Sequence, residues 1–202
     1  MESKREFSLR QKTFSNLLWR FMERMGAQLV ALVVSLILAR ILSPEHYGLI
    51  ALVTVITSIL NVFVDSGLGS ALIQKKNADD TDFSTVFYAN IFICIILYIV
   101  LFFTAPLIAH FFKKLELVSV IRVHGISVII SGVKNVQQAY VSKHLMFKKF
   151  FFATIGGAIV SAIVGIVLAV RGFGVWALVL QQLISAFIDT CILWLIVPWR
   201  PK

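Results

Sequence analysis

The stretch FSTVFYANIFICIILYIVLFFTAPLIA, residues 83–109, contains no aspartate, glutamate, lysine or arginine. About 20 predominantly apolar residues are enough for one helical crossing of a bilayer. Residues 150–170 form a second stretch of this kind. The whole chain is 59% hydrophobic and 14% charged, with a mean hydropathy of +0.90, against roughly 45–50% apolar and about 25% charged residues in soluble domains. The sequence therefore predicts an integral membrane protein.

Four other ranges are apolar but carry isolated charged side chains. The range 48–73 is interrupted only by Asp65, and the range 173–197 only by Asp189. The range 17–39 carries Arg20, Glu23 and Arg24 in its opening turns, and the range 117–141 carries Arg122, His124 and Lys134. A bilayer admits only helices and closed barrels, and these ranges are too long for barrel strands. The predicted fold class is an all-α integral membrane protein with six transmembrane helices, at about 17–39, 48–73, 83–109, 117–141, 150–170 and 173–197.

The lysines and arginines between the predicted helices indicate the orientation. If the N-terminus is cytoplasmic, the cytoplasmic side holds Lys4, Arg5, Arg10, Lys12, Lys75, Lys76, Lys143, Lys148, Lys149, Arg200 and Lys202, and the outer side holds Arg40, Lys113, Lys114 and Arg171. This excess predicts that both termini are cytoplasmic. The chain then divides into a basic segment (1–16), a six-helix lobe (17–199) and a short C-terminal segment (200–202). The net charge of +9 favours an anionic leaflet over nucleic acid, because the basic residues lie between apolar ranges.

Four of the predicted helices carry a polar stripe, because their polar residues recur at the spacing of one helix face. The stripes are Arg20, Arg24, Gln28, Ala31 and Ser35; Thr54, Thr57, Ser58, Asn61 and Asp65; His124, Ser127, Ser131, Lys134 and Gln138; and Gln181, Gln182, Ser185 and Asp189. Charged groups at such depths usually face a bundle interior or a wet cavity. The stripes therefore predict a polar lining, in which Asp65 pairs with a basic residue of a neighbouring helix.

Simpler interpretations of these residues remain open. Polar stripes also join helices by hydrogen bonds, and serine or threonine often bonds to its own backbone. Arg20, and less readily Arg24, could extend to the cytoplasmic interface. Arg122 lies near the outer end of its helix and could only anchor that end.

Small residues recur at every fourth position of the fifth predicted helix. They are Ala153, Gly157, Ser161, Gly165 and Ala169. Small side chains let another backbone approach closely. This pattern predicts a helix-packing surface, within the bundle or at a subunit contact.

Motifs of catalysis and of metal binding are missing from the sequence. The four histidines are far apart, SGLGS at 66–70 interrupts an apolar range instead of joining a strand to a helix, and there is no nucleophile elbow. Cys94 and Cys191 lie inside apolar ranges, which argues against a disulfide framework. We therefore expect no enzymatic activity, no cofactor and no metal site.

Several segments in order along the chain resemble one family of bacterial membrane proteins. They are LARILSPEHYGLIAL (38–52), DSGLGSALIQKK (65–76), APLIAHFF (105–112), HLMFKKF (144–150), GFGVWALVLQQL (172–183) and WLIVPWRPK (194–202). Together they resemble the polysaccharide transporter family, which includes Wzx-like O-antigen and colanic-acid flippases of the multidrug/oligosaccharidyl-lipid/polysaccharide exporter superfamily.

The resemblance implies a fold of two six-helix lobes around a central cavity, of which this chain would be the N-terminal lobe. Residues 200–202 would then be the cytoplasmic start of the linker between the lobes. It implies flipping of undecaprenyl-diphosphate-linked oligosaccharide across the bacterial cytoplasmic membrane, with membrane lipid and a second lobe or a homodimer as partners. The substrate-path candidates are Arg20, Arg24, Gln28, Asn61, Asp65, Arg122, Lys134, Gln138, Gln182 and Asp189. Four of these are cationic, as a diphosphate requires.

Other interpretations of the whole chain compete with this one. The chain could be a split subunit, a truncated product or a fragment of a flippase. It could also be a scaffold of a polysaccharide assembly complex or an inert remnant. A membrane-embedded transferase is disfavoured, because large loops with acidic residues are missing from the sequence.

Overall fold

The computed structural model describes residues 2–64, 68–75, 78–144 and 146–202, and the side chains from Leu18 onward except that of residue 147. The regular structure of this part of the chain consists of helices: α1 (Glu2–Ile41), α2 (Pro44–Val64), α3 (Leu68–Gln74), α4 (Asp80–Phe111), α5 (Glu116–His124), α6 (Ile126–Lys143), α7 (Phe147–Val170) and α8 (Val175–Ile196). Within the described residues, six spans are long and apolar enough to cross a membrane: Leu18–Ile41, Pro44–Val64, Asp80–Phe111, Glu116–Lys143, Lys148–Val170 and Val175–Ile196. The predicted all-α class with six membrane-spanning helices is confirmed.

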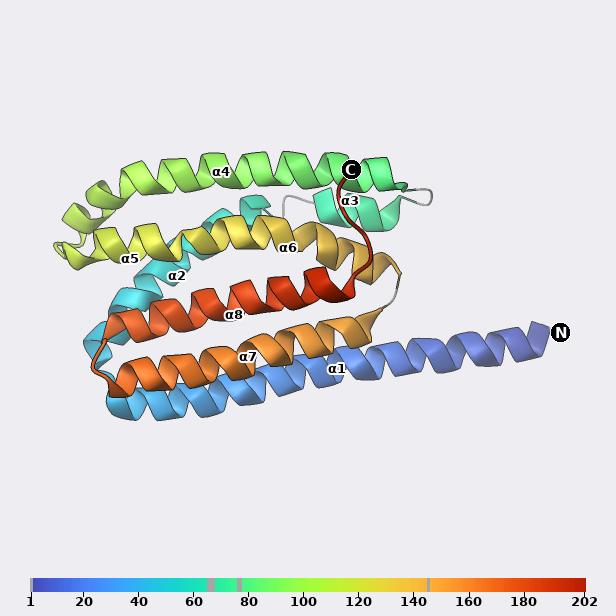
Figure 1. Cartoon of the computed structure of the whole chain (residues 1–202), viewed down its shortest axis with the longest axis horizontal. Helices are drawn as coiled ribbons and strands as arrows, with labels where there is room; N and C mark the ends of the chain where they lie inside the picture. Colours follow the sequence, from blue (N-terminus) through green and yellow to red (C-terminus); the bar gives the residue numbers. More distant parts are fainter. Residues whose placement is uncertain (1, 65–67, 76–77, 145) are drawn as a thin grey trace.

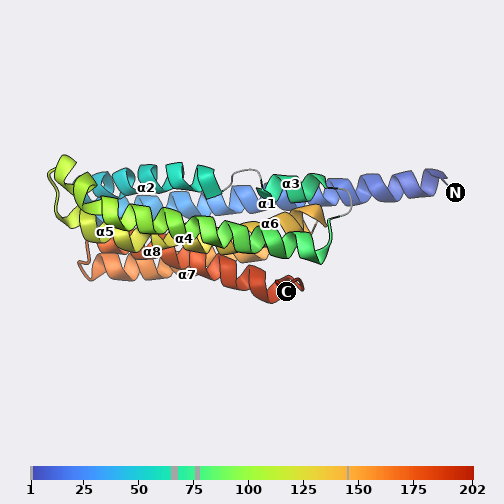
Figure 2. The ribbon, with the colours of Figure 1, turned by 90° about the horizontal axis from the view of Figure 1, so that it is seen from above.

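The helices run side by side along the long axis of the molecule, and both termini lie toward the same end (Figure 1). We call this the terminal end and the other the loop end. The loop end carries the turn between α1 and α2 and the segments before α5 and α8. Seen from above, α2 and α3 lie along one side of the bundle and α7 along the other (Figure 2).

Two predicted spans are divided in the structure. The predicted range 48–73 is shared between α2, which ends at Val64, and the short helix α3. The 21 residues of α2 rise about 30 Å, which already matches the hydrocarbon core, so α3 is not needed for the crossing. The predicted range 117–141 is shared between α5 and α6, which Gly125 joins in helical backbone geometry, donating to the Ile121 carbonyl over 2.8 Å.

The packing order of the helices differs from their order in the chain. α1 packs on α7, α7 on α8, α8 on α6, and α6 on α4, while α2 packs against α5, α6 and α8. One apolar core, with Val53, Leu117 and Ile121 at its centre, lies toward the loop end. A second core, with Phe83, Leu193 and Trp199, lies toward the terminal end. Apart from this packing on α7, most of the membrane-spanning part of α1 is exposed.

The small residues at every fourth position of α7, which we call the small-residue ladder, are buried. They are Ala153, Gly157, Ser161, Gly165 and Ala169. A Cβ added at Gly157 would lie 2.8 Å from the Ser185 carbonyl oxygen, and one at Gly165 would lie 2.8 Å from Cγ of Gln181. The ladder therefore faces α8, and the missing side chains let the two helices approach closely.

The C-terminal segment folds back over the terminal end. The Gln137 amide donates to the Trp199 carbonyl over 3.3 Å, and the Lys202 backbone amide donates to Ser84 Oγ over 3.1 Å. Trp199 is buried against Phe83 and Tyr140. Residues 197–202 thus attach the exit of α8 to α4 and α6, and Figure 1 shows the C-terminus beside the start of α4.

Candidate functional site

The membrane-spanning part of α1 has two faces with different surroundings. Its packing face carries the buried residues Glu23, Val34 and Leu38. The flank beside it carries the predicted polar stripe, in which Arg20 is half-buried and Arg24, Gln28, Ala31 and Ser35 are exposed. We call this flank the α1 polar face.

Two contacts show that the α1 polar face is directed toward α2 and α3. At the loop end, the Tyr47 hydroxyl of α2 donates to the Ser35 carbonyl over 3.3 Å. At the terminal end, Arg20 lines a pocket together with Gly69 and Ser70 of α3. α1 and α2 are joined by a short turn at the loop end and diverge from there toward the terminal end (Figure 1).

The pocket at this open end, which we call the terminal pocket, has a volume of about 340 Å³. It is lined by Arg20 of α1; Gly69, Ser70 and Ile73 of α3; Asn135, Gln138, Ala139 and Ser142 of α6; and Phe150 of α7. Two predicted path residues, Arg20 and Gln138, thus lie in one pocket although they come from different helices. Asn135 was missed by the sequence analysis, although its position three residues before Gln138 places it beside that residue on α6.

Arg20 is held by its own helix and by α7. Its Nη1 donates to Glu23 Oε2 over 2.8 Å, and its guanidinium lies 4.9 Å from the Phe150 ring centroid. Glu23, which the site prediction did not include, is buried and also accepts from the Thr154 hydroxyl over 3.4 Å. The one sequence signal for Glu23 was a carboxylate at i+3 from an arginine in an apolar helix.

An ion pair joins α6 to α8 inside the membrane-spanning region. Lys134 Nζ donates to Asp189 Oδ2, and their side chains are 24% and 9% exposed. The other carboxylate oxygen, Oδ1, is buried and has no hydrogen-bond partner among the described residues. Two predicted path residues therefore form a pair in which the lysine is the more accessible member.

The candidates nearer the loop end lie in two different environments. Gln182 Oε1 of α8 and His124 Nε2 of α5 are 2.8 Å apart in a partly buried contact between the helices. Arg122 instead faces α4, where its Nε donates to the Phe102 carbonyl over 3.3 Å and its guanidinium lies 4.0 Å from the Phe102 ring centroid. These contacts match the interpretation of Arg122 as an anchor better than a place in the polar lining.

The polar stripe of α2 mostly bonds to its own helix. The hydroxyls of Thr54, Thr57 and Ser58 donate to carbonyls three or four residues earlier. Asn61 is half-buried, and its Oδ1 has no partner among the described residues. Asp65, and with it the expected pairing of Asp65, lies outside the described residues.

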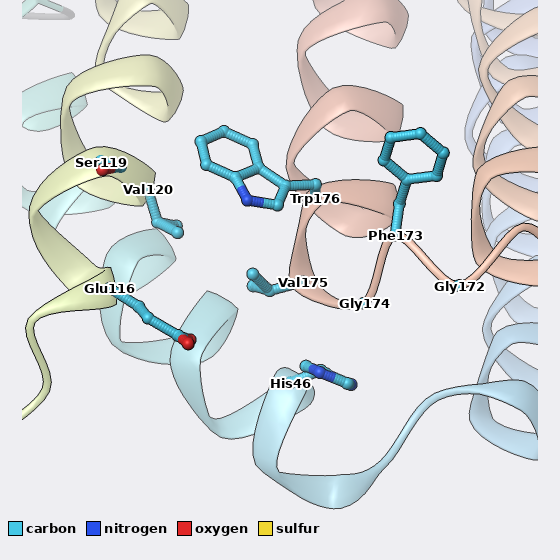
Figure 3. Close-up of a pocket in the computed structure, with 9 residues that line it drawn as sticks. All are labelled: His46, Glu116, Ser119, Val120, Gly172, Phe173, Gly174, Val175 and Trp176. Carbon is cyan, nitrogen blue, oxygen red and sulfur yellow. The ribbon is translucent and has the colours of Figure 1, made fainter.

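The loop end is closed by polar contacts between segments. Lys114 Nζ pairs with the Glu45 carboxylate, and the Ser43 hydroxyl lies 3.0 Å from His46 Nδ1. A pocket of about 340 Å³ lies beside them, where His46 of α2, Glu116 of α5 and Trp176 of α8 surround the turn that contains Gly174 (Figure 3). Gly174 has a φ of 55°, and a Cβ there would lie 2.8 Å from His46 Nε2. The bundle is thus joined at the loop end and open between α1 and α3 at the terminal end.

The side chains described above offer cationic and amide donors. No group of three histidine, cysteine, aspartate or glutamate side chains could hold a metal ion in the part of the chain that the structure describes. Arginine and amide donors are the groups that bind phosphate oxygens and sugar hydroxyls.

This chain is similar to known proteins of polysaccharide biosynthesis. Residues 37–202 match the family described as "Polysaccharide biosynthesis protein". The succinoglycan biosynthesis transport protein ExoT of Rhizobium meliloti (strain 1021) is 26% identical over 187 residues, which are 93% of this chain and 38% of the relative. No solved structure matches.

Two further relatives have similar identities. The teichuronic acid biosynthesis protein TuaB of Bacillus subtilis (strain 168) is 25% identical over 140 residues, 69% of this chain and 29% of the relative. The lipopolysaccharide biosynthesis protein WzxC of Escherichia coli (strain K12) is 25% identical over 142 residues, 70% of this chain and 29% of the relative. The chain thus spans about a third of the length of the curated relatives it matches. Since the family match covers most of the chain, the resemblance to polysaccharide transporters is confirmed, and the chain belongs to the polysaccharide biosynthesis protein family.

Proposed function

We propose that this chain forms one lobe of a transporter that moves undecaprenyl-diphosphate-linked oligosaccharide across the bacterial cytoplasmic membrane. Both termini and the terminal pocket would then face the cytoplasm, as the distribution of basic residues indicates. The family match and the transport function in the name of the ExoT relative support export of a polysaccharide precursor. The observation that carries the proposal is the terminal pocket, which combines Arg20 with amide and hydroxyl side chains of α3 and α6.

The chemistry of the terminal pocket fits the head group of such a lipid. A diphosphate needs cationic donors, and sugar hydroxyls need groups that both donate and accept. Arg20 supplies the first, and Asn135, Gln138 and Ser142 supply the second. Arg24 and Gln28 continue this chemistry along the α1 polar face toward the loop end. The polyprenyl tail would stay in the lipid beside α1.

The α1 polar face also favours a partner that completes the path. A charged side chain facing hydrocarbon costs about 2.5–3.5 kcal/mol on insertion scales. Arg24 is exposed and, among the described residues, forms no hydrogen bond or ion pair. We propose that a second six-helix lobe or a second copy of this chain covers the α1 polar face and encloses a wet cavity.

Arg24 provides the cleanest test of the path. Removal of Arg20 would leave the buried Glu23 without its cationic partner. Removal of Arg24 leaves no charged group without a partner, so the Arg24→Ala protein should fold normally. Arg24→Ala should abolish complementation of a flippase-deficient strain at unchanged membrane levels. Arg24→Lys should retain part of the activity, because the charge survives without the guanidinium fork.

Arg171→Ala is the matched control, because Arg171 is also exposed but lies at the loop end. It should complement like the unmodified chain. Full activity of Arg24→Ala would remove Arg24 from the path. Loss of the Arg24→Ala protein from the membrane would instead support a structural role.

Reconstitution separates a lobe from a complete transporter. We expect that this chain alone does not flip lipid-linked oligosaccharide in liposomes, and that co-expression with a second lobe restores flipping. Robust flipping by a demonstrably monomeric 202-residue chain would contradict the proposed need for a partner. Absence of flipping with every second lobe tested would favour the scaffold interpretation.

A further inference from the structure

A third pocket lies between α4, α6 and α8 and shares no residue with the terminal pocket. Its volume is about 430 Å³, and the surface that lines it is entirely apolar. The lining residues are Phe87 of α4; Ile129, Ile130 and Val133 of α6; and Phe187, Thr190, Cys191 and Trp194 of α8. The Thr190 hydroxyl donates to the Ala186 carbonyl over 2.7 Å, so its hydrogen-bond donor is already satisfied within α8. We call this the apolar pocket, and Figure 1 shows the two helices α4 and α8 that border it on either side of α6.

The apolar pocket lies between three helices that are long and apolar enough to cross a membrane. An apolar chain therefore fits this lining better than water does. Hydrophobicity alone selects no particular lipid there, because a helix surface and a lipid tail are equally apolar. Any selectivity must come from a polar group at the end of the pocket.

Such a group is present where α8 ends. The Arg200 guanidinium lies 5.2 Å from the ring centroid of Trp194, which lines the apolar pocket. Its Nη1 donates to the carbonyls of Val197 over 2.6 Å and Trp199 over 2.7 Å, and its Nη2 donates to the Trp194 carbonyl. The guanidinium is therefore fixed in place by one carbonyl of the last turn of α8 and two carbonyls of the segment that follows it.

Arg200 has no acidic partner among the described residues. Its hydrogen-bond partners are neutral carbonyls. The residue is exposed and lies shortly after the end of a helix that is long and apolar enough to cross a membrane, and basic residues in such positions commonly lie near the lipid head groups. A fixed cation beside an apolar pocket is complementary to an anion that carries an apolar chain.

We propose that the apolar pocket and Arg200 together bind one anionic phospholipid of the bilayer. One acyl chain lies in the pocket between α4, α6 and α8, and the phosphate lies at Arg200. This site is separate from the terminal pocket, because the two pockets share no lining residue. The bound lipid would connect α4 and α8 across the surface of α6.

The fluorescence of Trp194 reports occupancy of the site, because this side chain lines the pocket. The chain is placed in phosphatidylcholine nanodiscs that contain a minor fraction of brominated phosphatidylglycerol or, at the same fraction, brominated phosphatidylcholine. The Trp194 signal is the difference between the unmodified chain and Trp194→Phe. We expect the anionic lipid to quench this signal with about fivefold higher apparent affinity, the factor expected for one basic residue near an anionic surface.

The variants separate charge from shape. Arg200→Gln should remove the preference, and Arg200→Lys should keep most of it. Arg171→Gln, at an exposed arginine of the loop end, should leave it unchanged. Cys191→Phe should remove the preference by filling the pocket, with Arg200 still in place. All variants are compared by size-exclusion profile, so that a misfolded variant is recognised.

Three results would overturn the proposal. The first is equal quenching of the unmodified chain by the two brominated lipids, which needs no variant to interpret. The second is an undiminished preference in a well-folded Arg200→Gln. The third is displacement of brominated phosphatidylglycerol by an equimolar polyprenyl phosphate, which would assign the pocket to the tail of an isoprenoid lipid.

Discussion

Separating Lys134 from Asp189 should destabilise the lobe far more than removing both charges. Lys134→Met leaves a carboxylate that is 9% exposed and whose Oδ1 already lacks a partner among the described residues. Removing one member of a buried ion pair costs about 3–5 kcal/mol, and an aspartate inside a membrane costs about 2.5–3.5 kcal/mol. We take about 3 kcal/mol, where the two ranges overlap. Since one kcal/mol shifts the melting temperature of a chain of this size by about 2–4 °C, Lys134→Met should lower it by about 6–12 °C.

The partner substitution should cost less. Asp189→Leu leaves the Lys134 ammonium, whose side chain is 24% exposed and can reach water on its flexible stem. The double variant Lys134→Met with Asp189→Leu strands no charge, and replacing a buried pair by apolar residues is often neutral. We therefore expect the double variant to melt within a few degrees of the unmodified chain.

The assay measures the melting temperature of the unmodified chain, the two single variants and the double variant in a mild detergent. Unfolding is detected as the loss of the monodisperse size-exclusion peak. The interaction energy from this cycle should be at least about 2 kcal/mol. Hydrogen bonds between membrane helices average only about 0.6 kcal/mol. A value that small, or strict additivity of the two substitutions, would refute the buried ion pair. If the double variant is stable but does not complement a flippase-deficient strain, Lys134 or Asp189 also serves transport.

Gly157→Leu should lower the stability of the lobe by about 1–3 kcal/mol, because a Cβ at this position would lie 2.8 Å from the Ser185 carbonyl; thermal melting checks this against Gly48→Ala, which meets nothing within 4 Å and should be neutral or slightly stabilising. Topology can be read by labelling single cysteines from outside intact cells, which should reach Glu45→Cys and Lys113→Cys but not Lys75→Cys or Lys148→Cys; labelling of Lys75→Cys would reverse the proposed orientation. Arg122→Gln should complement normally, because its contacts are with Phe102 of α4, and a transport defect in a stable protein would return Arg122 to the substrate path.

Much of the fold follows from local composition. Residues 83–109 have to cross a membrane as a helix, since their backbone can be satisfied in no other way in hydrocarbon, and the structure has α4 there. The small-residue ladder of α7 could also be predicted from local sequence, because residues at every fourth position of a helix lie on the same face. Which helix packs against that face could not be predicted, and the structure shows that it is α8.

The division of the range 48–73 shows a limit of hydropathy. α3 is apolar enough to continue the pattern of α2, but the crossing is complete at Val64. Instead of extending the span, α3 packs on α6 and contributes Gly69 and Ser70 to the terminal pocket. Composition does not distinguish a residue in lipid from one packed against another helix, because both environments are apolar.

The sequence predicted which polar residues belong to the candidate site but not which of them contact each other. Helical periodicity placed Lys134 and Asp189 on polar stripes, yet their ion pair joins positions 55 residues apart. The contact of Glu23 with Thr154 joins positions 131 residues apart. Arg122 shares its helix with the polar lining but turns to α4, since the ring of Phe102 is available there.

The sequence by itself determined that this protein lies in a membrane, how many membrane helices it has and which faces of those helices are polar. These properties depend on residues within one or two helical turns of each other. The tertiary structure decided which polar faces meet, which charges pair, and that α1 stays open toward α2 and α3 while α7 is covered on two sides. Those outcomes depend on which helices pack against each other. The free energy that favours one packing arrangement over another comes from contacts between residues that are far apart in the chain.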